Sequence, residues 1–166
     1  ATANGEHLLK IRNFSSKNST TLLINYIDNV SFAPVDYLLR SDQETFSLSK
    51  GNTVRFYLEG GPAQANQYYL MIAGFSGCYP GFDMDGVNVP LNWDMLVGMC
   101  FNNPGFIAPG FFGQFDGNGQ AMATMAVPND QSLLNLALFY SYIVLSPGPS
   151  TPVLDASNAI NTIIVK

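Results

Sequence analysis

Short stretches in which apolar and polar residues alternate run along most of the chain, a pattern typical of β-strands with one buried face. The stretch 53–59 alternates in this way, and its even residues should belong to the core: Val54, Phe56 and Leu58. The stretch 133–145 is apolar at every even position from 134 to 144, which predicts a long strand. The stretch 67–75 is rich in Tyr, Leu, Met and Ile, as expected of a buried central strand.

Turn-forming residues separate these stretches and indicate the fold class. Lys50-Gly51-Asn52 predicts a hairpin between strands at 44–49 and 53–59. Asp116-Gly117-Asn118-Gly119 predicts a tight turn before a strand at 120–127. Further strands are expected at 7–14, 20–27 and 159–165. Many short strands between turns are typical of an all-β fold, here an antiparallel β-sandwich with a jelly-roll-like arrangement.

We expect two parts in the chain. Residues 1–35 would form N-terminal strands that complete or pair with a neighbouring domain or subunit, and residues 36–166 would form the β-sandwich domain. Ala1-Thr2-Ala3 resembles the end left by proteolytic processing.

Residues 76–113 interrupt the alternation with many Gly and Pro residues and contain both cysteines. We expect a long loop excursion with one helical turn at 92–97, and long ordered loops often carry function. A disulfide between Cys78 and Cys100 would close a loop of about 20 residues and would contribute roughly 3 kcal/mol. Two free thiols are the alternative.

The charge distribution narrows the possible functions. Only 11% of residues are charged, the net charge is -5, and no Lys, Arg or His occurs between residues 56 and 165. Such a surface does not suit nucleic acids or anionic membranes, and it offers few general bases or activated nucleophiles. No apolar run reaches about 18 residues, so membrane insertion is not expected. We therefore expect a secreted or cell-surface protein without catalytic function.

Carboxylates in the excursion are candidates for calcium, which takes six to eight oxygen ligands. Asp83 and Asp85 lie in one Gly-containing loop, and Asp94 could join them. Plain turn chemistry is the alternative, since Asp and Gly form tight turns without a metal. No other cofactor is expected.

Aromatic residues in the excursion are candidates for glycan binding, because exposed rings stack on sugar faces. The candidates are Trp93, Tyr79 and Phe82, with Trp93 the strongest. The alternative is that these rings form a local core. A second apolar group is too rich for a solvated loop, so it either packs under the sheet or forms an interface. The interface candidates are Phe106, Ile107, Phe111 and Phe112.

Several motifs carry a resemblance to a known family. In chain order they are GPAQA at 61–65, YLMIAG at 69–74, SGCYPG at 76–81, VPLNWD at 89–94, GQFDGNGQA at 113–121, YSY at 140–142 and SNA at 157–159. From about residue 48 onward the chain resembles a C-terminal β-sandwich domain common in large secreted proteins of planctomycetes and other environmental bacteria. Cys78 departs from the Thr usual in that family. The resemblance implies no activity, but a surface, sorting or binding module.

The N-terminal part carries a weaker resemblance. Residues 26–32, YIDNVSF, are similar to the last strand of galactose-binding-like jelly rolls, a similarity that covers residues 7–35.

These observations favour a structural or adhesive module of an extracellular assembly. It would act through strand addition and apolar contacts, by self-association or with another extracellular protein. The alternatives are a carbohydrate-binding accessory module of a larger secreted enzyme, with a polysaccharide as partner, and a secretion or sorting domain.

Overall fold

The computed structural model describes residues 37–48, 53–147 and 152–166, which form eleven strands and one α-helix. The described residues all belong to the unit Pro34–Lys166. The predicted N-terminal strands and the Lys50-Gly51-Asn52 turn lie outside the described residues. Within the described ranges, no helix is long and apolar enough to cross a membrane.

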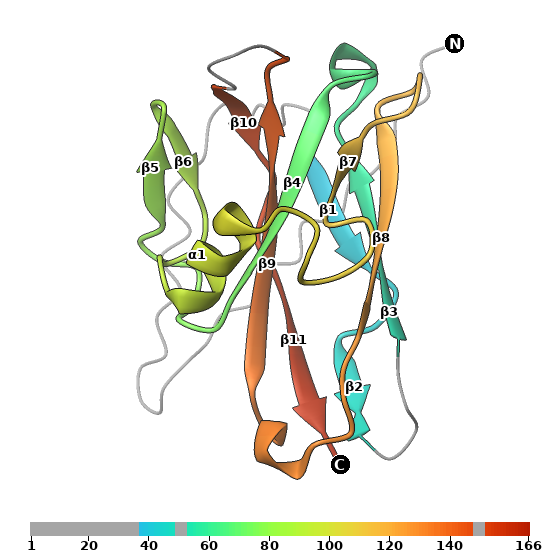
Figure 1. Cartoon of the computed structure of the whole chain (residues 1–166), viewed down its shortest axis with the longest axis vertical. Coiled ribbons are helices and arrows are strands. Elements are labelled where there is room, and N and C mark those ends of the chain that lie inside the picture. Colours follow the sequence, from blue (N-terminus) through green and yellow to red (C-terminus); the bar gives the residue numbers. More distant parts are fainter. Residues whose placement is uncertain (1–36, 49–52, 148–151) are drawn as a thin grey trace, which may run out of the picture. The chain divides into compact units, whose positions relative to one another are not determined.

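The strands form two main sheets (Figure 1). The larger has the order β2 (Thr45–Ser47), β11 (Ile160–Val165), β9 (Ala137–Leu145), β4 (Tyr68–Gly74) and β7 (Phe112–Gln114), and β10 (Val153–Ala156) also pairs with β9. The smaller has the order β1 (Leu38–Ser41), β3 (Thr53–Glu59) and β8 (Gln120–Ala126). Neighbouring strands are antiparallel except β2 and β11, which are parallel.

Large aromatic side chains fill the space between the two sheets. The ring of Phe56 on β3 lies 4.7 Å from that of Tyr140 on β9, centroid to centroid. The Tyr142 hydroxyl donates a 3.0 Å hydrogen bond to the carbonyl of Glu59, which links β9 to β3. The even residues of β3 are completely buried, as their alternation predicts. The all-β, sandwich-like fold is therefore confirmed.

A third layer covers the other face of the larger sheet (Figure 1). It consists of α1 (Met95–Asn102) and a hairpin of β5 (Phe82–Met84) and β6 (Val87–Val89). A Cβ atom at Gly74 of β4 would lie 3.1 Å from Val97, so α1 contacts the strand closely. Burial on both faces explains why residues 69–73 are buried and apolar without alternation. The predicted helical turn is the start of α1, which extends five residues further.

The predicted hairpin between 44–49 and 53–59 is wrong, because β2 and β3 enter different sheets. β2 pairs with β11, with Thr45 opposite Ile163, whereas β3 pairs with β1 and β8. The tight turn at Asp116 is confirmed: Oδ1 of Asp116 accepts 2.8 Å hydrogen bonds from the N–H groups of Asn118 and Gln120. It joins β7 to β8 and is a corner between the two sheets.

Ser157 and Asn158 fill the break between β10 and β11, which run along the same side of β9. The Ser157 hydroxyl accepts from the N–H of Tyr142 at 2.9 Å, and the Ser157 N–H donates to the carbonyl of Tyr142. The Asn158 amide accepts from the N–H of Leu39 at 2.7 Å and donates to the carbonyl of Leu39 at 3.2 Å. Asn158 therefore takes the place of a strand partner for β1 and ties the two sheets together.

Candidate functional site

Most predicted site residues lie in the segment 76–102, which contains the third layer and is fastened to the end of β4 by Asn92 and Asp94. The side chain of Asn92 donates to the carbonyl of Ser76 at 2.7 Å and accepts from the N–H of Gly81 at 3.1 Å. The loop 76–81 is thereby held beside the segment that carries Trp93. The motifs at 76–81 and 89–94 thus contact each other, and their polar residues have a structural role.

Asp94 is the N-cap of α1 and uses both carboxylate oxygens. Oδ1 accepts from the N–H groups of Leu96 and Val97, and Oδ2 accepts from those of Phe75 and Ser76, at 2.7 to 3.0 Å. Partial burial alone would raise the pKa of Asp94, but these hydrogen bonds outweigh it and hold the pKa below its usual value. A carboxylate fixed in this way is poorly suited to act as a general acid.

The three calcium candidates are not brought together as one site. Oδ1 of Asp83 accepts from the N–H of Gly86 at 3.3 Å, within its own turn, and Oδ2 of Asp85 accepts from the N–H of Val153 on β10 at 2.9 Å. Asp94 is occupied at the helix N-terminus. In the part of the chain that the structure describes, no group of three or more His, Cys, Asp or Glu residues could hold a metal ion. Asp83 has a role in its own turn, Asp85 bonds the backbone of β10, and Asp94 caps α1.

Two of the three glycan candidates, Trp93 and Phe82, lie in one aromatic cluster with Phe101. Trp93 stacks on Phe101 with centroids 5.5 Å apart and an interplanar angle of 14°, and Phe82 meets the edge of Trp93 at 5.1 Å. The Trp93 side chain is 55% exposed. The third candidate, Tyr79, is 87% exposed in the adjoining loop. The cluster therefore has a packed side and a side open to solvent.

The predicted disulfide is wrong, because Cys78 and Cys100 are free thiols with different surroundings. Cys100 lies on the buried side of α1, where its Sγ accepts from the N–H of Ala73 on β4 at 3.4 Å. Cys78 is exposed in the loop 76–81. The α-helix, and not a covalent bond, holds this part of the excursion on the sheet.

We expect the two thiols to differ strongly in reactivity. Burial raises the pKa of the Cys100 thiol, and only the thiolate is an effective nucleophile. With a maleimide at neutral pH, Cys78 should react at least roughly 100-fold faster than Cys100, which should react only after denaturation. Cys78→Ser should remove the fast reaction alone. If the intact mass were two hydrogens lower than expected and the denatured chain took up no label, the prediction of a disulfide would be correct after all.

The four interface candidates separate into core and surface residues. Phe111 is buried and meets Phe56 edge-on at 6.1 Å, so its assignment to an interface is corrected: it is a core residue. Ile107 is half-buried. Phe106 is 77% exposed, and Phe112 is 44% exposed and stacks on Tyr68 with centroids 6.0 Å apart.

Two further exposed apolar residues, both methionines, lie on α1 in the same part of the sequence and were not among the predicted site residues. Met95 and Met99 are one helical turn apart and are 73% and 38% exposed. We define the apolar strip as the five exposed residues carried by 93–112: Trp93, Met95, Met99, Phe106 and Phe112. A signal was available in the sequence, since no charged residue occurs from 95 to 115. The strip is therefore free of charged residues from Met95 to Phe112, and Asp94 is the one charged residue within 93–112.

Comparison with family models, with curated proteins and with solved structures finds no match to the chain. The resemblance of residues 48–166 to secreted bacterial domains stays a prediction.

Proposed function

We propose that this domain is a non-catalytic module of a cell-surface or extracellular assembly, which binds a second copy or another extracellular protein through the apolar strip. The observation that supports this most is the exposure of four apolar side chains on 95–112, a segment without charge. Burying a Met or Phe side chain contributes about 1.5–3 kcal/mol, so exposed side chains of this size favour association.

The charge distribution supports contact between copies. At a net charge of -5, two copies repel each other on average. In a two-fold symmetric contact the same patch meets itself, so like charges would face each other wherever the patch carried them. Because 95–115 has no charged residue, the part of the strip from Met95 to Phe112 can meet its own copy without that cost.

Strand addition receives less support from the two edges of the smaller sheet. At the β1 edge, the backbone of Leu39 is bonded to Asn158. At the β8 edge, Gln120 is bonded to Asp116, and the N–H of Thr124 donates to the carbonyl of Pro109 at 3.0 Å. Apolar contacts are therefore the main mechanism that we propose.

The test is self-association of the full chain by light scattering over a wide concentration range. Met95→Asp and Phe106→Asp should each weaken association by about tenfold or more, since the buried side chain is lost and a charge is introduced. Met95 is the first residue of α1, where an acidic residue favours the helix, so this variant should still fold. Leu154→Asp is the matched control, because Leu154 is similarly exposed at 43% but lies on β10. A wild-type chain that stays monomeric at the highest concentration, or strip variants that associate like the control, would argue against the proposal.

Carbohydrate binding is a second candidate, which the exposed and stacked ring of Trp93 favours. A ring held flat by Phe101 is pre-oriented to stack on a sugar, which reduces the entropy lost on binding. Trp93→Ala is included in the binding experiment described below.

A further inference from the structure

The outer face of the three-stranded sheet carries a second surface suited to a ligand, on the opposite side of the sandwich from α1. The register places Arg40, Tyr57 and Met122 in one row across β1, β3 and β8. The next row contains Glu59 and Gln120, directly opposite each other. Tyr57 and Met122 are 40% and 55% exposed, so an aromatic and an apolar side chain lie side by side on this face.

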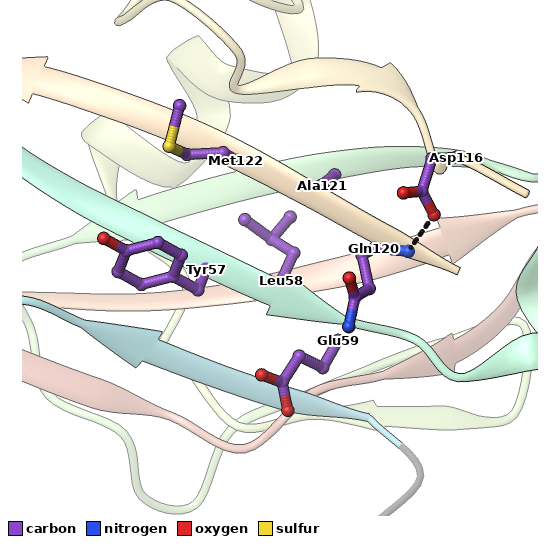
Figure 2. Close-up of a pocket in the computed structure, with 7 residues that line it drawn as sticks. All are labelled: Tyr57, Leu58, Glu59, Asp116, Gln120, Ala121 and Met122. Atoms are coloured by element: carbon purple, nitrogen blue, oxygen red, sulfur yellow. Dashed lines mark hydrogen bonds between the residues drawn. The ribbon is translucent and has the colours of Figure 1, made fainter. Parts of the chain in front are cut away.

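These rows border an open hollow of about 330 Å³ (Figure 2). It is lined by Tyr57, Leu58, Glu59, Asp116, Gln120, Ala121 and Met122. Figure 2 shows Tyr57 and Met122 toward one end, and Glu59, Gln120 and Asp116 toward the other. The hollow lies at the lower end of the range of about 300–1,000 Å³ typical of small-molecule sites. It therefore has an apolar end and a hydrogen-bonding end.

The polar end is held in place while some of its groups stay available. One oxygen of Asp116 is bonded to the N–H groups of Asn118 and Gln120, and these bonds keep the pKa of Asp116 below its usual value. Among the described residues, the side-chain amide of Gln120 and the hydroxyl of Tyr57 have no hydrogen-bond partner within the protein. Glu59 forms an ion pair with Arg40 across the β1–β3 ladder. Rigid strands and a fixed turn thus present acceptors and an amide in set positions.

We propose that this hollow binds one or two sugar units of a neutral saccharide. A pyranose ring presents C–H groups on its faces, which suit Tyr57 and Met122, and hydroxyls around its edge, which suit Gln120, Asp116 and Glu59. An anionic ligand is disfavoured, because the hollow is lined by two carboxylates, and Arg40, in the same row as Tyr57, is paired with one of them. A small cation would find only one carboxylate without an ion-pair partner. The proposal does not depend on the apolar strip, which uses none of these residues.

The experiment is a screen of the full chain on an array of neutral and acidic oligosaccharides, followed by calorimetry with the best neutral binder. Tyr57→Ala should weaken binding by about tenfold or more, whereas Tyr57→Phe, which keeps the ring, should stay within about threefold of wild type. Gln120→Ala should also weaken binding by several-fold, through the lost hydrogen bonds. Thermal unfolding checks each fold, and Tyr57→Ala should still fold because a cross-strand pair contributes only about 0.2–1 kcal/mol.

Trp93→Ala separates this proposal from the second candidate function. If the hollow is the site, Trp93→Ala binds like wild type. Loss of binding in Trp93→Ala with retention in Tyr57→Ala would place the saccharide on the aromatic cluster and overturn the proposal. No binding of any neutral oligosaccharide at millimolar concentration, or binding of acidic ones alone, would also overturn it. Self-association of the strip variants is measured separately, so either proposal can fail without the other.

Discussion

Gly119→Ala is expected to remove most of the stability of the domain, at a cost of about 4 kcal/mol or more. Gly119 has a φ of +75°, a conformation that costs other residues free energy. A Cβ atom at this position would lie 1.8 Å from the carbonyl oxygen of Gly61 and 2.5 Å from its carbonyl carbon. Both are backbone atoms, so the clash cannot be relieved by a side-chain rotation.

A hydrogen bond holds Gly119 in place, so the backbone cannot easily move to relieve the clash. Its carbonyl accepts a 2.8 Å hydrogen bond from the N–H of Gly60, at the end of β3. The backbone of Gly119, in the motif at 113–121, therefore lies directly against the backbone of Gly61, in the motif at 61–65. Domains of this kind are stable by about 5–15 kcal/mol in total, so we expect Gly119→Ala to be recovered in low yield and to unfold at a much lower urea concentration.

Two other glycines give matched controls. Gly117→Ala, in the same turn, meets nothing within 4 Å and needs no positive φ, so it should change stability by less than about 0.5 kcal/mol. Gly86→Ala has an open site but a φ of +83°, so it should show the conformational cost alone, about 1 kcal/mol. Similar midpoints of urea unfolding for the variants at 117 and 119 would contradict the close approach of the two backbones.

Asp94→Ala is expected to have the second largest effect, a loss of about 2–3 kcal/mol at neutral pH. An N-cap contributes about 1 kcal/mol, and the N–H groups of Phe75 and Ser76 lose their acceptor as well. The loss should loosen α1 on β4. Faster labelling of Cys100 in this variant would report that loosening directly, since Cys100 lies on the buried side of the helix.

The same carboxylate makes this contribution depend on pH. The pKa of Asp94 is lower in the folded chain than in the unfolded one. Its stabilisation is therefore complete above the unfolded value of about 4, and it is lost as the pH falls through the lower, folded value. The difference in unfolding free energy between wild type and Asp94→Asn should be constant from pH 7 to 5 and should shrink toward pH 2. Asp130→Asn is the comparison: the hydrogen bond from the N–H of Ser132 also lowers the pKa of the exposed Asp130, so its effect should have the same sign, but it caps only one N–H of a short 3₁₀ turn. A difference between wild type and Asp94→Asn that does not vary with pH would show that the charge of Asp94 has no part in the stabilisation.

The local sequence pattern was enough to predict the features that depend on residues close together in the sequence. The alternation of Val54, Phe56 and Leu58 predicts their burial because side chains of a strand point alternately to its two faces. The turn at Asp116 follows from Asp, Asn and Gly chemistry within four residues. The clustering of Phe82 with Trp93 could be anticipated from the crowding of aromatic residues in a loop-rich segment.

Features set by distant partners could not be predicted in this way. The position of β2 is set by its pairing with β11, more than 110 residues away, and not by the turn-forming residues that precede β3. The cysteines lie in Gly- and Pro-containing segments typical of disulfide-bonded loops, but α1 turns Cys100 toward β4. The hollow at Tyr57 depends on the register of β3 against β8, which places Tyr57 opposite Met122 across 65 residues of chain. No local pattern encodes that register.

The pairing of β4 with β9 also has a consequence for how quickly the chain folds. These strands are the centre of the larger sheet, with Tyr68 opposite Leu145 and Gly74 opposite Phe139. The whole of the third layer lies between them in the sequence, so a long loop must close before their contacts form. The chain loses conformational entropy when this loop closes, and the contacts between the strands offset that loss only afterwards. We therefore expect folding in milliseconds to seconds. The apolar strip is part of that intervening segment. A nascent chain therefore exposes the strip before β9 has been synthesised and the larger sheet can form.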